Sequence, residues 1–379
     1  MKIPIARPWF TDAEHRALRA PLRAGWPAQG PQTQAFEQEF ARAAGAPFAV
    51  AASSCTAAMH LALAALGVGP GDEVIVPSFT FVATANAVEY TGARPVFCDV
   101  LPRTYTIDPE DFERRITKRT RAVMPVHLFG LCADMPAIMQ IARRHKLSVI
   151  EDAACAAGAT WNGIPAGAFG HAGCFSFHGR KIITTGEGGM LVTRSRKLAD
   201  RARSLRSHGE SVSAAERHEK GGFELPSYDT LGFNYRMTDL QAAVGREQLL
   251  KLDRIIALRQ KGAAYYTKHL GDMPGVTLPA APEQAGHTFQ SYVIVLDKSL
   301  NRNRVGRELA ERGIGVRPGA HAVHMLGYYR NKYGHKPGDF PVARRLHEQS
   351  MALPLFPRMS RRDQDTVLEC LRAVLAAQG

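Results

Sequence analysis

A single lysine stands between an apolar run and a glycine-rich turn in the middle of the sequence. In FSFHGRKIITTGEGGMLV (175–192), Lys181 follows the apolar residues, and Gly186, Gly188 and Gly189 come shortly after it. A lysine in this place could be a surface charge, a phosphate contact or a nucleophile, and in isolation the surface charge is the commonest of the three. Other residues of the chain are needed to distinguish among these roles.

Two other apolar runs end in polar features. Asp152 ends LSVIED, where a buried carboxylate needs a partner, either an arginine or a cationic ring nitrogen. A helix that begins within SSCTAA would offer free backbone N–H groups and a partial positive charge, which suit a phosphate group. Ser54 or Thr56 could instead do no more than cap that helix.

The lysine, the acid and the anion site match the needs of one cofactor, pyridoxal phosphate. This cofactor takes a lysine for a Schiff base, an acid on its pyridinium nitrogen and a site for its phosphate. A carboxylate beside the ring nitrogen favours the protonated ring, which accepts electrons when the substrate carbon loses a proton. A lysine whose pKa is lowered by burial or by a cationic neighbour can carry that proton. The motifs GxxxxGK[ST], GxGxxG, HExxH and GxSxG are absent from the sequence.

Short apolar runs alternate with helical patterns over the first 200 residues. Strands that alternate with helices predict an α/β domain with a mainly parallel sheet. Ligands of such sheets collect at the carboxyl ends of the strands, where we expect Asp152, Lys181 and the helix that starts near Thr56. The seven predicted strands lie within 47–53, 73–77, 94–100, 121–129, 147–154, 173–178 and 188–193.

The C-terminal part of the chain has a different pattern. Polar residues 210–230 predict a long surface loop, and residues 239–270 have the sustained periodicity of a helix that bridges to a second domain. We predict a large domain with an N-terminal arm over 1–250 and a smaller α+β domain over 251–379. Further predicted elements are strands near 290–296 and 313–318 and a last helix over 362–378.

Composition excludes several classes of protein. The six cysteines are scattered without a CxxC pair, which argues against a disulfide framework and against a zinc site, so we expect no metal. No apolar run approaches the length of a membrane span, and the first residues lack a signal-peptide core, so we expect a cytoplasmic protein. The formal net charge of +13 suits anionic metabolites. A nucleic-acid partner is the alternative, which no motif supports.

Several longer stretches resemble one known family. GDEVIVPSFTFVATANAV, VIEDAA, FSFHGRKIITTGEGGM, LGFNYRMTDLQAA, KPGDFPVA and ALPLFP follow one another in the order found in the DegT/DnrJ/EryC1/StrS aminotransferases. The resemblance runs nearly end to end. It implies the fold-type I architecture of pyridoxal-phosphate transferases, with a seven-stranded mainly parallel sheet in the large domain. It also implies a role in amino-sugar and polysaccharide biosynthesis.

The resemblance implies roles for individual residues around the cofactor. Lys181 would form the Schiff base and move the proton, and Asp152 would pair with the pyridine nitrogen. Thr56 and Ala57 would meet the phosphate at the start of their helix, and Ser176 would add its hydroxyl.

The resemblance further implies an aromatic contact and a second subunit. Phe81 would stack on the cofactor ring, although core packing is the commoner use of a lone aromatic residue. Asn234 would reach the phosphate of the neighbouring subunit, which implies a homodimer with shared active sites. Cys155 departs from the family, which usually has His, Gln or Glu there, so we expect it only as a neighbour of the cofactor ring.

Three histidines are candidates for the substrate side of the site. His178 lies in the lysine motif, and His321 and His324 lie in GAHAVHMLGYY. All three are candidates for substrate binding. For His321 and His324, the even alternative to lining the sugar pocket is a structural role at a domain contact.

The family resemblance implies a reaction. The chain would move an amino group from an amino acid, with glutamate as the expected donor, to a keto sugar on a nucleotide diphosphate. Relatives that remove a sugar hydroxyl have His in place of the lysine, and Lys181 argues against that chemistry. The TTGEGG loop is more similar to members that act on 4-keto sugars than to those that act on 3-keto sugars. Amination of a keto-cyclitol, and a binding protein without turnover, remain alternatives.

Overall fold

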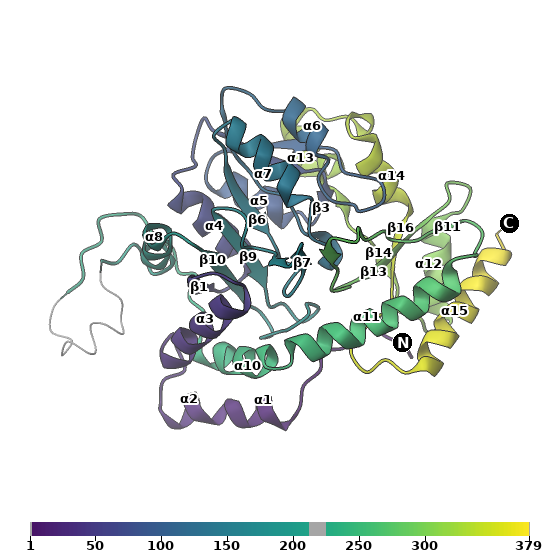
Figure 1. Cartoon of the computed structure of the whole chain (residues 1–379), viewed down its shortest axis with the longest axis horizontal. Helices are drawn as coiled ribbons and strands as arrows, with labels where there is room; N and C mark the ends of the chain where they lie inside the picture. The colour runs from purple at the N-terminus through teal and green to yellow at the C-terminus, as the bar shows by residue number, and fades with distance from the viewer. Residues whose placement is uncertain (1, 212–224, 379) are drawn as a thin grey trace.

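The computed structural model describes residues 2–211 and 225–378 and arranges the first half of the chain around a seven-stranded sheet (Figure 1). Four neighbouring pairs of strands are parallel, and β10 runs antiparallel to both of its neighbours. Each of the seven predicted apolar runs contains or overlaps one strand, so the predicted sheet is confirmed. In spatial order the strands are β1 (Phe48–Ala52), β10 (Gly189–Thr193), β9 (Ala172–Ser176), β6 (Ser148–Asp152), β5 (Thr120–Val123), β2 (Glu73–Pro77) and β4 (Arg94–Cys98).

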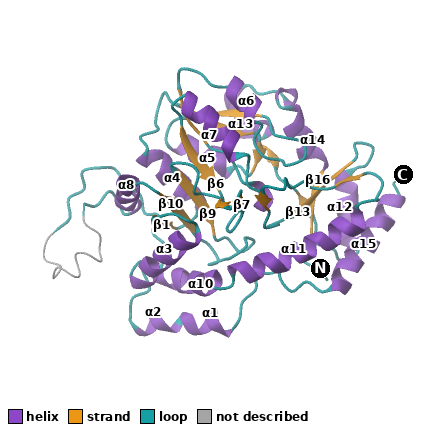
Figure 2. Ribbon diagram, viewed as in Figure 1, coloured by secondary structure: helices purple, strands orange, loops and turns teal. Residues whose placement is uncertain are grey.

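Helices cover both faces of this sheet, which explains its unbroken apolar strands (Figure 2). Val50 faces the core that contains α4 (Cys55–Ala65), whereas its neighbour Ala51 faces the core that contains α3 (Pro31–Ala43). The first core also takes residues of α5 (Ala83–Tyr90) and α8 (Arg196–Arg206), and the second takes residues of α7 (Met135–Arg144) and α10 (Asp239–Leu249).

A second, antiparallel sheet lies in the C-terminal part of the chain. Its strands are β11 (Val276–Thr277), β13 (Tyr292–Leu296), β16 (Ser350–Leu353) and β14 (Arg317–Pro318), in that spatial order. Residues of α11 (Leu252–Leu270), α12 (Arg302–Glu311) and α15 (Arg361–Ala376) share a core with it. The predicted strands near 290–296 and 313–318 and the predicted last helix are confirmed.

Shorter elements complete the described chain. None of its helices combines the length and the apolar character that crossing a membrane requires. The remaining elements are α1 (Asp12–Ala17), α2 (Arg19–Arg23), β3 (Phe79–Thr80), α6 (Pro109–Arg114), β7 (Thr160–Trp161), β8 (Ile164–Pro165), β12 (Ala285–Gly286), β15 (His321–Ala322), α13 (Gly327–Tyr333) and α14 (Pro341–Gln349), with 3-10 turns at Leu128–Gly130, Val323–Met325 and Pro337–Asp339.

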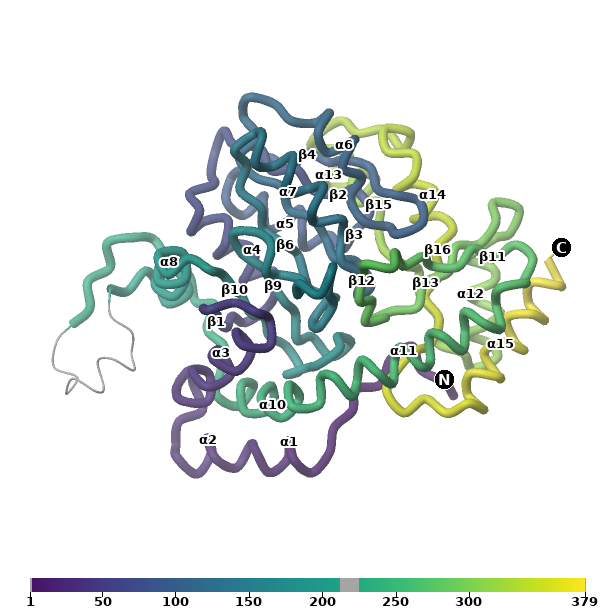
Figure 3. Tube along the Cα trace, viewed as in Figure 1, coloured from purple at the N-terminus to yellow at the C-terminus, as the bar shows by residue number. Residues whose placement is uncertain are grey.

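The helix predicted over 239–270 is divided into α10 and α11, which follow one another along one side of the molecule (Figure 3). The break falls at Leu250 and Lys251. There the Nζ of Lys251 donates to the carbonyl of Trp9 at 3.0 Å and to the carboxylate of Glu14. The N-terminal segment therefore holds the joint between the two helices, which the periodicity of residues 239–270 could not reveal.

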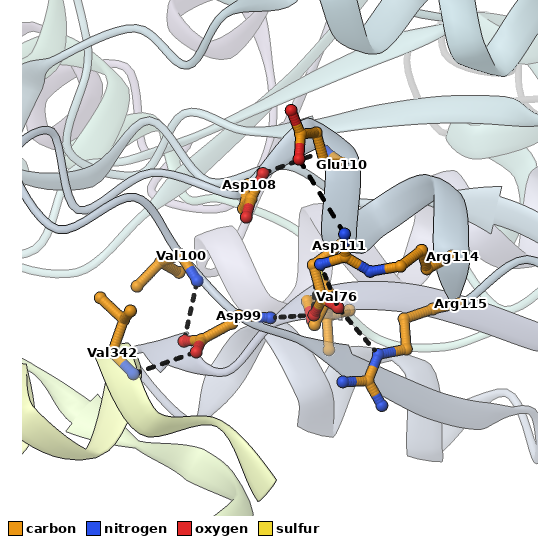
Figure 4. Close-up of polar contacts among 10 residues, drawn as sticks. Val76, Asp99, Val100, Asp108, Glu110, Asp111, Arg114, Arg115 and Val342 are labelled. Carbon is orange, nitrogen blue, oxygen red and sulfur yellow. Dashed lines mark hydrogen bonds and ion pairs between the residues drawn. The ribbon is translucent and has the colours of Figure 1, made fainter.

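Contacts cross the predicted domain boundary at residue 250 in both directions. Ile3 pairs with Ile314 and belongs to the C-terminal core, whereas Tyr329 and Leu346 belong to the core of the large sheet. Figure 4 shows one such contact, in which the carboxylate of Asp99 accepts the backbone N–H of Val342 at 3.0 Å. N-terminal and C-terminal segments thus each pack against the part of the chain on the other side of residue 250. The division into domains 1–250 and 251–379 remains a prediction.

The predicted surface loop 210–230 lies partly outside the described residues, since 212–224 are not described. At its ends, Glu210 pairs with Tyr228, and the N–H of Ser211 donates to the carbonyl of Ser227 at 3.0 Å. The two ends of the segment therefore lie side by side.

Asp239, in the stretch LGFNYRMTDLQAA, has a structural role. The buried carboxylate of Asp239 accepts the backbone N–H groups of Gly30, Gln32 and Thr33 at 2.8–3.0 Å and the hydroxyl of Thr33 at 2.7 Å. Gly30 precedes α3 and has no side chain with which to cap it. Asp239 therefore caps α3 from another helix and joins the two elements.

We expect replacement of Asp239 by Ala to lower the free energy of unfolding by about 3 kcal/mol, because several buried donors lose their acceptor. Urea denaturation of the two proteins measures the difference. Asp253→Ala is the matched control, since Asp253 is an exposed acid in the first turn of α11, and we expect its change to stay below about 0.5 kcal/mol. Equal effects of the two substitutions would contradict the assignment of the cap.

Candidate active site

Asp152 is a nearly inaccessible acid at the end of β6, with 4% of its surface exposed. Its Oδ2 accepts the hydroxyl of Thr84 at 2.7 Å, and its Oδ1 accepts the N–H of Ala154 at 3.1 Å. Burial raises the pKa of Asp152 above its usual value, while these two hydrogen bonds and the charge of Lys181 act against that rise. No arginine of the described chain pairs with it, so the cationic-ring alternative gains support.

Lys181 lies in the turn that follows β9 and is partly buried. Its Nζ donates to the Sγ of Cys155 at 3.1 Å. Burial alone would lower the pKa of Lys181, but the neighbouring Cys155, together with Cys55 and Asp152, raises it above the usual value. The condition for proton transfer, a pKa lowered by burial or by a cationic neighbour, is therefore not met in the chain without ligand, where the neighbours of the amine raise its pKa.

The glycines behind Lys181 let the chain return close to the start of α4. Gly186 has a φ of +84°, in the left-handed region that disfavours side chains. A Cβ on Gly189 would lie 2.3 Å from the backbone carbon of Ser54, which is closer than atoms can approach. The glycine-rich turn therefore brings β10 between the lysine strand and the first turn of α4.

The proposed phosphate contacts lie around that first turn. Ser54 caps α4, because its Oγ accepts the N–H of Ala57 at 3.1 Å, so the capping alternative is realised by Ser54. The strand register sets Gly189 opposite both Ala52 and Ser176. Ser176, in β9, is therefore separated by β10 from β1, the strand that leads into α4, and Thr56 is partly exposed in the first turn of this helix. Their contact with a phosphate remains a prediction.

Phe81 presents an open aromatic ring beside the strand ends. Its exposed fraction is 60%, so it does not pack in the core of the single chain. The preceding strand β3 pairs with β15, which brings the ring of His321 to 6.4 Å from the ring of Phe81, centroid to centroid. This exposure favours the predicted stacking on the cofactor ring over core packing.

The other two histidines occupy different environments. His324 is fully buried, with its Nδ1 2.5 Å from the Oγ of Ser78 and its Nε2 3.4 Å from the carbonyl of Pro337. This environment corresponds to the structural alternative and not to a pocket lining. His178 is partly exposed, and its Nε2 lies 3.8 Å from a carboxylate oxygen of Glu187.

Asn234 is exposed, in a segment whose backbone is fixed on both sides. The carbonyl of Phe233 accepts the N–H of His208 at 2.8 Å, and the carbonyl of Tyr235 accepts the N–H of Ser53 at 2.7 Å. The side chain is therefore held outward from the chain, as a contact to a second subunit requires, and that contact remains a prediction.

Thr84 and Glu151 were not among the predicted site residues. Glu151 is fully buried and accepts the N–H groups of Gly167, Phe169 and Gly170 at 2.7–2.8 Å; its Oε2 lies 2.8 Å from the Nε2 of His127. Successive residues of a strand point to opposite faces, so the adjacent acids of VIEDAA have separate tasks. That alternation was the available signal for Glu151, whereas Thr84 required the placement of α5 against β6.

The arrangement fits pyridoxal phosphate. A buried carboxylate that accepts two hydrogen bonds from the protein, a lysine 3.1 Å from Cys155, an exposed aromatic ring and the first turn of a helix are the kinds of group that the cofactor needs. In the residues that the structure describes, no three His, Cys, Asp or Glu side chains are grouped to hold a metal ion. The fold and the side chains define an enzyme of the pyridoxal-phosphate transferase class.

Comparison with known proteins identifies the family. Residues 9–372 match the model of the DegT/DnrJ/EryC1/StrS aminotransferase family, and the chain belongs to this family. It is 40% identical to the spore coat polysaccharide biosynthesis protein SpsC of Bacillus subtilis (strain 168), covering 98% of this chain and 97% of that protein. It is 41% identical to the GDP-perosamine synthase of Caulobacter vibrioides, covering 90% of this chain and 89% of that enzyme.

A solved structure agrees with these sequence relatives. Spr1654 from Streptococcus pneumoniae, in its PMP-form, has a TM-score of 0.94 and 27% identity, covering all of both chains. The predicted family, the fold class and the cofactor are therefore confirmed. The chain is an aminotransferase that uses pyridoxal phosphate.

We expect replacement of Asp152 by Asn to stabilise the cofactor-free chain at pH 8 by about 1 kcal/mol, because a buried charge is removed. Burial raises the pKa of Asp152 above its usual 3.8, so the folded chain binds the proton more readily than the unfolded chain. The free energy of unfolding of the wild type therefore falls as the pH rises from the usual pKa of an aspartate to the raised pKa of Asp152. Above the raised pKa the whole of this loss is present.

Urea unfolding between pH 4 and pH 8 measures this difference, and the gap between the two proteins should narrow toward pH 4. Asp253→Asn, at an exposed acid, serves as the control with no pH-dependent gap. An Asp152→Asn variant that is less stable than the wild type at every pH would show that the carboxylate charge is fully compensated.

Proposed function

We propose that the chain transfers an amino group from L-glutamate to a keto sugar carried on a nucleotide diphosphate, and that the amino group enters at C4. The observation that carries this proposal is the joint placement of Lys181, Asp152 and the open ring of Phe81 at the carboxyl ends of the strands. The name of one relative, a GDP-perosamine synthase, supports a sugar attached to a nucleotide, and that of another, a spore coat polysaccharide biosynthesis protein, supports a sugar substrate.

The residues of this chain would divide the work. Pyridoxal phosphate supplies an aldehyde that takes up the amino group and a ring that accepts electrons. The carboxylate of Asp152 holds a proton at the ring nitrogen, and the Nζ of Lys181 removes a proton from the donor carbon and returns one to the sugar carbon. The ring of Phe81 would exclude water from one face of the cofactor ring. The donor leaves as a 2-oxo acid, and the ketone oxygen leaves as water.

Binding of the substrates would use the charge of the chain. Both the donor and the nucleotide-linked acceptor are anions, and the net charge of +13 favours their approach. His321 is the histidine best placed for the sugar, because it is partly exposed beside Phe81. A 3-keto nucleotide sugar and a keto-cyclitol are the competing acceptors.

The proposal includes a homodimer. Phe81 and Asn234 are both exposed in the single chain, and a second copy would place its Asn234 at the phosphate of the first. The same arrangement would enclose the open side of the site.

The first test is an absorbance spectrum of the purified protein with added pyridoxal phosphate, before and after glutamate. We expect a band from the cofactor bound to Lys181, which glutamate converts to the band of the aminated cofactor. Lys181→Ala should lack the first band or its conversion. Lys197→Ala removes an exposed lysine and is the matched control with wild-type behaviour. A wild type without any band would contradict the proposed site.

The second test is a panel of acceptors offered to the aminated enzyme. We expect a 4-keto nucleotide sugar to restore the starting spectrum at least about a hundredfold faster than the matching 3-keto compound, because a misplaced ketone loses the alignment with Lys181. A keto-cyclitol without nucleotide should be inert. Faster turnover of the cyclitol would overturn the nucleotide-sugar acceptor, and faster turnover of the 3-keto sugar would overturn C4.

A further inference from the structure

A short relay of hydroxyl groups leads to the carboxylate of Asp152. The Oγ1 of Thr84, in the first turn of α5, lies 2.7 Å from the Oδ2 of Asp152, and the Oγ1 of Thr80, in β3, lies 3.1 Å from that of Thr84. All three side chains are buried, so no bulk water competes for these hydrogen bonds. The three groups lie on three different elements and meet only in the folded chain.

The direction of the relay follows from the number of protons. Thr84 has one hydroxyl proton and three acceptors within reach: the Oδ2 of Asp152 at 2.7 Å, the Oγ1 of Thr80 at 3.1 Å and the carbonyl of Phe81 at 3.2 Å. The carboxylate is the closest acceptor and carries the charge, so it takes the proton. The oxygen of Thr84 then accepts the hydroxyl of Thr80, and each bond polarises the next.

The alternative is a purely local role. A threonine near the start of a helix often bonds a carbonyl of the preceding turn, and the 3.2 Å contact with Phe81 has this pattern. That bond alone would leave the Oδ2 of a buried acid without its closest donor. The cost of an unsatisfied buried charge exceeds the value of a neutral hydrogen bond, so the contact with Asp152 decides the orientation of the hydroxyl.

We propose that Thr84, supported by Thr80, is a positioning residue that fixes the plane of the Asp152 carboxylate and keeps it ionised for the ring nitrogen of the cofactor. The inference rests on the proposed role of Asp152. With Thr84 on Oδ2 and Ala154 on Oδ1, the carboxylate cannot rotate without losing a bond. Since Phe81 lies between Thr80 and Thr84, one short segment both orients the acid and presents the aromatic ring.

The charged and titratable groups around Asp152 come from several elements. These groups are the same in every variant of Thr84, so a comparison among the variants measures the effect of the Thr84 hydroxyl alone. The groups are Lys181 after β9, His127 after β5, Cys55 at the start of α4 and Cys174 in β9.

The test compares Thr84→Val, which keeps the shape but lacks the hydroxyl, with Thr84→Ser, which keeps the hydroxyl. Titration of the cofactor-free full chain with pyridoxal phosphate measures the dissociation constant. We expect Thr84→Val to weaken binding about tenfold and Thr84→Ser to stay within about twofold of the wild type. Thr80→Val should weaken binding about threefold, because it acts through Thr84.

The pH profile of binding separates positioning from packing. Affinity should fall as pH falls and Asp152 gains a proton, and loss of the Thr84 hydrogen bond should move this fall to higher pH. Thr91→Val is the matched control, since Thr91 follows the same helix and its hydroxyl donates to the carbonyl of Val88 at 2.7 Å, away from the acid. Its affinity and pH profile should equal those of the wild type.

The outcomes are distinct. Equal losses in Thr84→Val and Thr84→Ser, with the wild-type pH profile, would assign Thr84 to packing and overturn the inference. Wild-type binding by Thr84→Val, together with weak binding by Asp152→Asn, would overturn the relay and leave the role of Asp152 intact. Wild-type binding and pH profile in Asp152→Asn would instead overturn the proposed role of Asp152 itself.

Discussion

The site depends on a carboxylate that is kept in the interior of the protein. Asp152 ends β6, near the middle of the seven-stranded sheet, where helices on both faces exclude water. Burial of its charge costs free energy, and hydrogen bonds from Thr84 and Ala154 offset only part of that cost. In the proposed site, a cationic ring nitrogen would offer the remaining compensation. The same feature that weakens the empty protein would then favour binding of the cofactor, as in other sites where stability is given up for function.

The acids that accept several backbone N–H groups have a different task from Asp152. Asp152 faces the site, whereas Glu151, on the opposite face of β6, holds the backbone of residues 167–170. Asp239 caps α3, and Asp99 accepts the first N–H groups of α14. In each scaffold case a carboxylate replaces water at unpaired N–H groups of a loop or helix start, and joins segments that are distant in the sequence. Asp152 thus differs from these three acids in that only two donors, Thr84 and Ala154, are seen at its carboxylate in the described chain.

The sequence predicted what depends on local pattern. Unbroken apolar runs located all seven strands, and the rule that ligands collect at strand ends brought Lys181 and Asp152 together. Features that depend on packing between distant segments were not predictable in this way. The break between α10 and α11 depends on Trp9 and Glu14, far away in the chain. His321 and His324 are three residues apart, yet one is partly exposed and the other is buried against Ser78.

The proton on Lys181 connects these observations. In the chain without ligand, acidic neighbours raise the pKa of this lysine, and Asp152 is one of them. A cofactor whose ring nitrogen takes up the charge of Asp152 would remove that contribution, so the amine would lose its proton more easily once the site is filled. Thr84 would set how strongly Asp152 is committed to the ring. The base strength of the lysine would then depend on the hydroxyl of Thr84 in α5, which acts on the lysine through Asp152.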